Sequence, residues 1–290
     1  MLPRAFSRAW FPRSGVGGYT LVELLVVLLI TSFMMTTLAG FFRTAVAARQ
    51  NAGAQTEAQQ GLRAVASVIT QELRQAGACL PRSGTFMALA GTENGLTDSL
   101  TLRIGRTNRT TGACLRAQIS TAGGAAVGAT TLLVDSTAGF GDAKRLLVAS
   151  ATTGAAEVYS ITGMTATSIT ISPGLLFAKP QNSRLYPLDE RVYQIQTWSG
   201  RSVLTVRVDG GSAQPLVDGV KEFNVTYQGM PCNTLGVCTL LALPTTDAAW
   251  RTVREVSLAP KIESRKKNRQ GQKVETTAAD SIRVKPRNLL

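Results

Sequence analysis

The longest apolar run of the chain lies near its N-terminus. Residues 24–42 contain no charged side chain, and Glu23 stands directly before them. At about 1.5 Å per residue, a helix over this run is about 28 Å long, which matches a hydrocarbon core of about 30 Å. The pattern predicts one membrane-spanning helix with a carboxylate at its head.

A helical pattern continues beyond this run. No proline stands between Pro12 and Pro81, and the residues after Arg43 are rich in Ala, Gln, Arg and Glu, which favour helices. The pattern predicts one helix over about 19–78, with a transmembrane half over 19–43 and an amphipathic half over 44–78. Its second half carries apolar residues three and four positions apart, and this face should pack on a globular domain. The face consists of Leu62, Val65, Ala66, Ile69, Leu73 and Ala76.

The middle of this helix has a different composition. Residues 48–61 are too polar to form a core and contain Gly53 and Gly61. Each glycine weakens a helix by about 1 kcal/mol relative to alanine. We therefore expect the helix to bend or to melt locally in this segment.

The pattern changes after residue 78 to short runs rich in Val, Ile, Leu and Thr, separated by Gly, Asp and Ser. The runs predict strands over 99–104, 130–134, 145–149, 158–162, 168–171, 191–197, 202–208, 222–227, 253–258 and 281–285. Their spacing leaves no room for crossover helices, which favours antiparallel meanders. The predicted fold class is α+β, with a long N-terminal helix packed on an antiparallel β-rich head over 79–290. Within the head, residues 125–176 form a glycine-punctuated set of strands that resembles a separable small β insert.

The flanks of the apolar run are asymmetric. Three arginines precede the run and no acidic residue occurs before Glu23, so the positive-inside rule keeps residues 1–18 in the cytoplasm. Most of the chain is then extracytoplasmic. A secretory signal peptide has a shorter apolar core followed by small residues at its cleavage site. Here Gly17 and Gly18 precede the run instead.

The order Gly18-Tyr19-Thr20-Leu21-Val22-Glu23 followed by a long apolar helix resembles the prepilin leader of type IV pilins and pseudopilins. The resemblance implies that residues 1–18 are a leader cut between Gly18 and Tyr19 by a prepilin peptidase. It also implies methylation of Tyr19 and makes Glu23 the fifth mature residue. Tyr19 departs from the family's usual phenylalanine or methionine. The alternative is an ordinary signal anchor in which Glu23 is incidental.

The resemblance also implies a role for Glu23 in assembly. A carboxylate at the edge of a membrane helix costs roughly 2.5–3.5 kcal/mol on insertion scales. In a bundle of such helices it can meet the positively charged N-terminal amine of a neighbouring subunit, and each charge then favours the other. Assembly would relieve a cost that the lone subunit bears.

Several further phrases are similar to the PilW family of minor pilins, which are related to J-type pseudopilins of type II secretion. They are Gly61-Leu62-Arg63, residues 71–77, residues 215–220 ahead of the strand over 222–227, and Arg287-Asn288-Leu289. The resemblance implies a scarce subunit that primes pilus assembly and sits at or near the fibre tip, where it supports surface motility and adhesion. A J-type pseudopilin remains the alternative.

The same resemblance implies the location and the partners. The chain would cross the bacterial inner membrane once with its head in the periplasm, and would later reach the pilus tip on the cell surface. Its partners would be other minor pilins and the major pilin through the N-terminal helix, the prepilin peptidase, the inner-membrane pilus assembly platform and a tip adhesin.

Four cysteines, Cys79, Cys114, Cys232 and Cys238, lie in the extracytoplasmic part, where disulfides persist. They lack the closely paired spacing typical of a four-thiolate zinc site, so disulfides are favoured. Four cysteines allow three pairings. Proximity favours Cys232 with Cys238 and Cys79 with Cys114.

The remaining composition bears on other functions. The formal net charge is +13 and the chain has no histidine, which excludes histidine metal sites and Ser/His or Cys/His catalysis. No paired carboxylates or phosphate-binding loop indicate an enzyme, and no cofactor or metal is expected. The basic segment over 265–269 suits phosphate contacts but lacks an aromatic residue for base stacking. We interpret it as an exposed hairpin turn between strands over 253–258 and 281–285, with a DNA- or surface-binding module as the alternative.

Overall fold

The computed structural model describes residues 18–81, 86–120, 123–232, 238–241, 252–267, 271–277 and 282–286. The chain divides into two compact units, Met1–Gln50 and Asn51–Leu290. The leader residues 1–17 and the closing residues 287–290 lie outside the described residues, so the predictions made on them are not tested.

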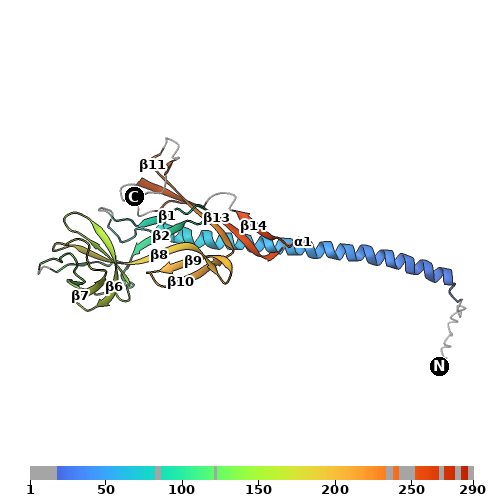
Figure 1. Cartoon of the computed structure of the whole chain (residues 1–290), viewed down its shortest axis with the longest axis horizontal. Helices are drawn as coiled ribbons and strands as arrows, with labels where there is room; N and C mark the ends of the chain where they lie inside the picture. Colours follow the sequence, from blue (N-terminus) through green and yellow to red (C-terminus); the bar gives the residue numbers. More distant parts are fainter. Residues whose placement is uncertain are drawn as a thin grey trace, which may run out of the picture. The chain divides into compact units, whose positions relative to one another are not determined.

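One helix, α1 (Leu21–Gln75), dominates the N-terminal part of the chain (Figure 1). It begins two residues later and ends three residues earlier than the pattern predicts. Gly77 follows its end with a φ of +79°, a conformation that glycine adopts at little cost. The helix is continuous through residues 48–61, so the expected local melting is absent. Bending there stays a prediction.

The head is an antiparallel β structure, as predicted. Its strands form two sheets, which the sequence did not predict. The first sheet has the order β1-β2-β8-β5-β6-β7-β4, with β9 and β3 also paired with β8 and β10 paired with β9. Its strands are β1 (Leu89–Thr92), β2 (Ser99–Gly105), β3 (Ala117–Gln118), β4 (Thr131–Leu133), β5 (Arg145–Ala149), β6 (Ala156–Met164), β7 (Ser168–Ser172), β8 (Arg184–Trp198), β9 (Arg201–Val208) and β10 (Ala213–Asp218).

The second sheet has the order β12-β11-β13-β14, with β15 also paired with β13. Its strands are β11 (Val220–Cys232), β12 (Cys238–Leu241), β13 (Val253–Lys267), β14 (Lys273–Thr277) and β15 (Ile282–Val284). The two sheets are joined in sequence at Gly219, whose φ of +80° makes the tight turn between β10 and β11.

The main core lies between the second half of α1 and both sheets. From the helix it takes Ala58, Val65, Ile69, Leu73 and Ala76, all of them buried. Strand β8 contributes Tyr193, and the second sheet contributes residues such as Phe223, Val225, Val256 and Leu258. The amphipathic stripe therefore packs as predicted.

The expectation that residues 48–61 are too polar for a core is wrong for one face of the helix. Ala54 and Ala58 are fully buried, and Gly61 lies close enough to β13 that an added Cβ would be 3.4 Å from the side chain of Ile262. Small residues let the helix backbone approach the sheet closely, which a search for large apolar side chains does not detect.

A second core lies in a small lobe, defined here as residues 117–185. Strands β4, β5, β6 and β7 supply half of its buried residues, and Ala117, Ile119 and Leu185 also belong to it. Strand β5 pairs with β8 from Arg145 opposite Leu188 to Ala149 opposite Arg184. The strands over 125–176 are therefore part of the continuous first sheet, and their independence as an insert stays a prediction.

The basic segment over 265–269 does not join the strands that the sequence predicts. Strand β13 extends to Lys267, and Lys267 lies opposite Lys273 of β14. Strand β15 pairs with the other end of β13, where Val256 lies opposite Val284. The strand that forms the hairpin with β13 is therefore β14, and not residues 281–285 as predicted. Strand β14 is too rich in charged residues to stand out in the sequence.

Candidate functional site

The N-terminal end of α1 is capped by Thr20. The amide of Glu23 donates to the Thr20 carbonyl at 3.0 Å and to its Oγ1 at 3.3 Å, and the amide of Leu24 donates to the same carbonyl at 3.2 Å. Threonine three residues before glutamate is a capping-box spacing, which satisfies amides that otherwise lack a partner at a helix start. Glu23 is held in the first turn of the helix, where the helix dipole stabilises a negative charge.

The hydroxyls inside the apolar run donate to backbone carbonyls of the same helix. Thr31 Oγ1 donates to the carbonyl of Val27 at 2.9 Å, and Thr36 Oγ1 donates to that of Phe33 at 2.8 Å. Bonds of this kind, to a carbonyl three or four residues earlier, let hydroxyls enter an apolar medium without losing their partners. The large apolar side chains from Leu21 to Val46 are exposed, and by length and composition this helix can cross a membrane.

Within the second unit, α1 is tied to β8 by Glu72. Its Oε1 accepts from Arg191 Nη1 and its Oε2 accepts from the hydroxyl of Tyr193. Burial, followed by the hydrogen bond to Glu72, raises the pKa of the Tyr193 phenol, so it stays a neutral donor. The three side chains fix the register of the helix on the sheet next to the buried Leu73.

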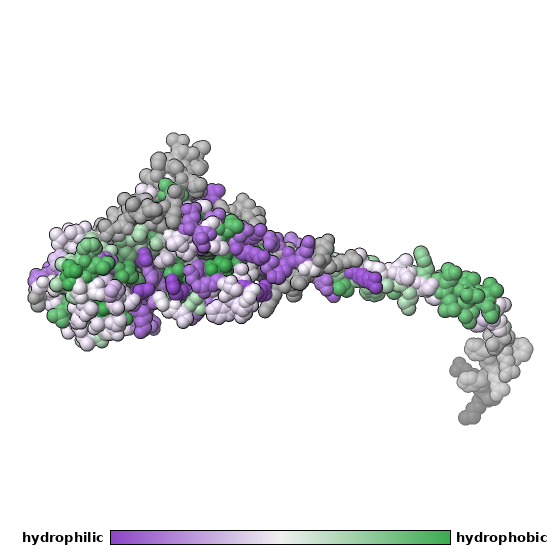
Figure 2. Space-filling view, in the orientation of Figure 1, coloured by the Kyte–Doolittle hydropathy of each residue, from purple (hydrophilic) through white to green (hydrophobic). Residues whose placement is uncertain are grey.

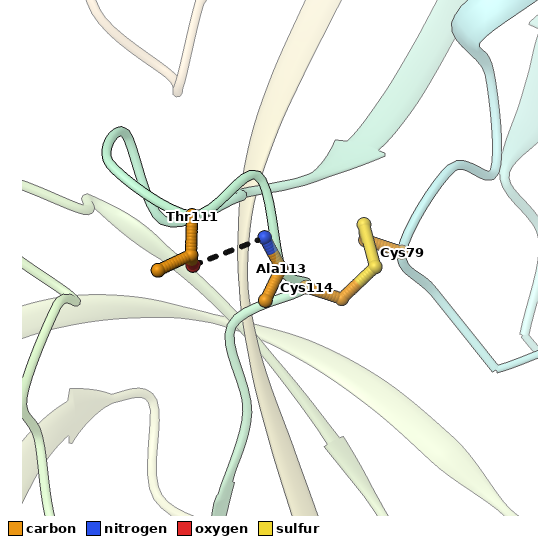
Figure 3. The surroundings of a disulfide bond; sticks show 4 residues. All are labelled: Cys79, Thr111, Ala113 and Cys114. Carbon is orange, nitrogen blue, oxygen red and sulfur yellow. Dashed lines mark hydrogen bonds between the residues drawn. A yellow bond between two sulfur atoms is a disulfide. The ribbon is translucent and has the colours of Figure 1, made fainter.

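A disulfide fastens the end of the same helix to the loop after β2. Cys79 and Cys114 are joined across a Cα–Cα distance of 5.1 Å (Figure 3). The loop that carries Cys114 is shaped locally. The Ala113 amide donates to Thr111 Oγ1 at 3.3 Å, the Asn108 amide donates to the Ala113 carbonyl at 2.8 Å, and the Thr110 amide donates to Asn108 Oδ1 at 2.8 Å. Gly105 lies under this link, where an added Cβ would be 2.7 Å from the Cys79 carbonyl.

The other two cysteines lie on adjacent strands. The backbone register places Cys232 of β11 opposite Cys238 of β12. Residues 233–237 between them are outside the described residues, and so are the two side chains. The Cys232–Cys238 disulfide stays a prediction, supported by a backbone pairing that brings the two Cα atoms within reach of such a bond.

An ion-pair network joins the small lobe to the rest of the first sheet. Arg106 on the connection after β2 binds Asp142 and Asp189, each at 2.7 Å. Arg145 of β5 binds Glu190 of β8 at 3.2 Å, and Arg103 of β2 binds the other oxygen of Glu190 at 2.8 Å. Every acid here has a basic partner, so the network orders the junction and offers no open carboxylate cluster.

The sequence-predicted site residues fall into two groups. Gly18, Tyr19 and Glu23 lie together at the head of α1, and the disulfide cysteines lie in the head domain. Sequence reasoning missed the capping role of Thr20, which the Thr-x-x-Glu spacing would have indicated. It also missed the contacts of Glu72, for which the sequence carries no local signal. Among the described residues, no three His, Cys, Asp or Glu side chains gather in a way that could hold a metal ion.

The fold and one motif indicate the class of the protein. One long apolar N-terminal helix with an antiparallel β head is consistent with the α+β pilin-like fold. Residues 13–39 match the family described as the prokaryotic N-terminal methylation motif. The match supports a type IV pilin- or pseudopilin-like protein that is anchored in the membrane, is processed by a prepilin peptidase and assembles with other pilins. No curated protein matches the chain.

Proposed function

We propose that this chain is a minor pilin of a type IV pilus, similar to the PilW family, that primes pilus assembly and sits at or near the fibre tip. The observation that carries the proposal is the methylation motif over 13–39, which contains Gly18, Tyr19 and Glu23 in pilin register. This motif supports a structural role for the chain. Neither the sequence nor the described residues present a catalytic constellation.

The three residues take distinct roles in this proposal. Prepilin peptidase cuts between Gly18 and Tyr19, and the new amine of Tyr19 is methylated. Glu23, held in the first turn by the Thr20 cap, meets the amine of a neighbouring subunit in the helix bundle. The exposed apolar side chains of α1 are buried first by lipid and later by neighbouring helices. The subunit can therefore pass from the inner membrane to the fibre.

The proposed partners follow from these roles. They are other minor pilins and the major pilin at the helix, the assembly platform in the inner membrane and an adhesin at the tip. Such a subunit supports adhesion and surface motility without forming the shaft. The head, with its two sheets and small lobe, suits one terminal position better than a repeat along a fibre.

The test is mass spectrometry of the mature N-terminus, together with a count of this chain in sheared surface fibres. We expect methylated Tyr19 and a trace amount of the chain relative to the main subunit. A Gly18→Val variant, which blocks the cut, is the control for the unprocessed mass.

Three results would overturn parts of the proposal. A chain that retains Met1 would be an ordinary membrane-anchored protein. Methylated chain that stays in the inner membrane and is absent from fibres would be a type II secretion pseudopilin of the J type. A copy number equal to that of the main subunit would remove the minor role.

A further inference from the structure

Two stretches of the small lobe are almost free of charge in a strongly basic chain. Residues 117–134 and 146–178 contain one charged residue, Glu157, where the chain-wide share of 17% would place about nine. These two stretches form β3, β4, β6 and β7, most of β5, and the loops between them. The basic residues that give the chain its net charge of +13 are therefore placed elsewhere.

The single charge of these stretches is neutralised inside the lobe. The Lys179 side chain is 0% exposed, and its Nζ lies 3.1 Å from Glu157 Oε2. Nζ also donates to the carbonyl of Ala155 at 3.2 Å, and the hydroxyl of Tyr159 donates to Glu157 at 2.5 Å. The charged pair therefore supports the lobe from within. The exposed charged residues of the lobe, Asp135, Asp142, Lys144 and Arg184, lie outside these two stretches.

Three large apolar side chains project from these two stretches. Val127 is 65% exposed, and Leu176 and Phe177 are each 62% exposed. Backbone bonds bring them together, because Ala125 and Lys179 exchange hydrogen bonds and the Gly128 amide donates to the Leu175 carbonyl at 2.8 Å. We call Val127, Leu176 and Phe177 the tip patch.

A groove of about 410 Å³ lies beside Phe177. Ser150, Thr152 and Thr153 line one wall, and Phe177, Ala178 and Pro180 line the other. The bond from Lys179 Nζ to the Ala155 carbonyl ties the two walls together. An exposed aromatic ring next to a preformed groove is the arrangement of an anchor point in protein interfaces.

The chemistry of the groove selects among ligands. Its walls, within residues 150–155 and 177–180, contain no carboxylate, amide or guanidinium side chain that would bind saccharide hydroxyls in pairs. The hydroxyls already accept backbone amides, since Ser150 Oγ accepts from Thr152 and Thr153, and Thr153 Oγ1 accepts from Ala155. The only basic side chain at the groove, Lys179, is buried and paired, so anionic lipid headgroups find no partner either.

We propose that the tip patch and its groove dock an uncharged, apolar surface of another protein. Depletion of charge around an aromatic anchor is what distinguishes the core of protein interfaces from ordinary surface. A charged partner surface would lose hydration there without gaining a counter-charge. A neutral apolar partner has no charged group to dehydrate, and its binding removes three apolar side chains from water.

The position of the lobe suits a second interface. Within the unit Asn51–Leu290, β6 and β7 lie beyond the C-terminal end of α1, away from Asn51 (Figure 1). Figure 2 shows this end of the head largely in white and green, whereas purple residues gather over the rest of the head. The inference goes beyond the proposed function, because it does not use Glu23 or the methylated terminus.

Photo-cross-linking in cells that produce the full chain tests the inference. p-Benzoylphenylalanine replaces Phe177 in one variant and Trp198, an aromatic residue that is 45% exposed on β8, in a control variant. We expect one discrete protein adduct from position 177 and none from position 198. The cross-linked peptide of the partner should be apolar and uncharged.

A second measurement separates docking from chance proximity. Val127→Ser with Leu176→Ser, added to the position-177 probe, should lower the adduct yield at least tenfold, whereas Val208→Ser, at a residue 41% exposed on β9, should not. Unchanged thermal unfolding would show that the lobe still folds. No adduct, an adduct to polysaccharide, lipid or a second copy, a charged partner peptide, or an unaltered yield would each overturn the inference. Methylation of Tyr19, measured in the same cells, reports the proposed function separately.

Discussion

Single charged side chains distinguish two regions of this protein, the start of α1 and the small lobe. At the start of α1, Thr20 caps the helix and Glu23 carries the only charge of residues 18–42. In the small lobe, Glu157 pairs with the buried Lys179 and accepts a hydrogen bond from the Tyr159 hydroxyl. In the proposed assembly, Glu23 meets the amine of a neighbouring subunit, whereas Glu157 pairs with Lys179 within the lobe.

Replacing Glu23 separates insertion from assembly. We expect Glu23→Ala to be inserted and cleaved normally, because the substitution only removes the roughly 2.5–3.5 kcal/mol that a charge costs at this position. Co-purification with partner pilins should fall, since the neighbouring amine loses its counter-charge. Val22→Ala, which keeps the carboxylate, is the control. Equal recovery of partners with both variants would contradict the assigned role.

Tyr159 predicts a dependence of stability on alkaline pH. Burial, followed by the hydrogen bond to Glu157, raises the pKa of Tyr159 from 10.0 to about 12. The unfolded phenol therefore loses its proton at lower pH than the folded one. This contribution to stability is complete below pH 10 and is lost as the pH rises toward about 12. Urea midpoints measured across this window should fall less steeply for Tyr159→Phe than for the wild type. Parallel slopes would contradict the prediction.

At the scale of elements, the second half of α1 is held on the head by complementary devices. Ile69 and Leu73 bury the apolar stripe, and Glu72 pairs with Arg191 and Tyr193 of β8. The Cys79–Cys114 bond then fixes the chain just beyond the helix. These contacts leave the opposite face of the helix exposed to solvent.

Removing Glu72 tests the polar part of this attachment. Glu72→Ala leaves the half-buried Arg191 and the buried Tyr193 hydroxyl without their shared acceptor. We expect a cost of about 3 kcal/mol, the upper end for an unsatisfied buried polar group. For a domain of this size the midpoint of thermal unfolding should fall by roughly 6–12 °C. Glu275→Ala, which breaks an exposed pair with Lys261, is the control and should change stability by less than about 1 kcal/mol. Similar shifts for the two variants would exclude a special role for Glu72.

Loss of the disulfide should have a larger effect. The bond closes a loop with a sequence separation of 35 residues, and the chain-entropy relation gives about 4 kcal/mol for a loop of this length. We expect a Cys79→Ser/Cys114→Ser variant to lose about this much free energy of unfolding, measured with urea in detergent. The double variant leaves Cys232 and Cys238 in place, so the effect belongs to one bond. A loss below about 1 kcal/mol would contradict the expectation.

At the scale of the whole molecule, the chain combines one membrane segment with a head that the positive-inside rule places outside the cytoplasm. Protease added to spheroplasts should therefore digest residues 79–290 and leave a protected fragment that contains the apolar run over 24–42. Addition of arginines after residue 43, which opposes the charge asymmetry, should reduce this accessibility. A head that resists protease until the inner membrane is lysed would reverse the assigned topology.

The sequence predicted much of the fold because its signals are local. Strand β5 was predicted with its observed bounds from a short apolar run. The helix was predicted within three residues from its apolar segment, its helix-favouring residues and the absence of proline. Strand β14 was missed since Lys273–Thr277 is polar and forms an edge. Strand β10 contains Pro215, which argues against a strand except at an edge. The first half of β8 contains Pro187 and charged residues and was missed for the same reason.

The sequence by itself indicated the prepilin-like motif, the apolar span, the position of Glu23 and the β-rich character of the head, because each is written within a few consecutive residues. Only the tertiary structure decided the contact of Glu72 with β8, the pairing of β13 with both β14 and β15, and the gathering of the tip patch. These depend on which distant segments share a sheet. That choice is made by the free energy of the whole packed head, and no local pattern records it.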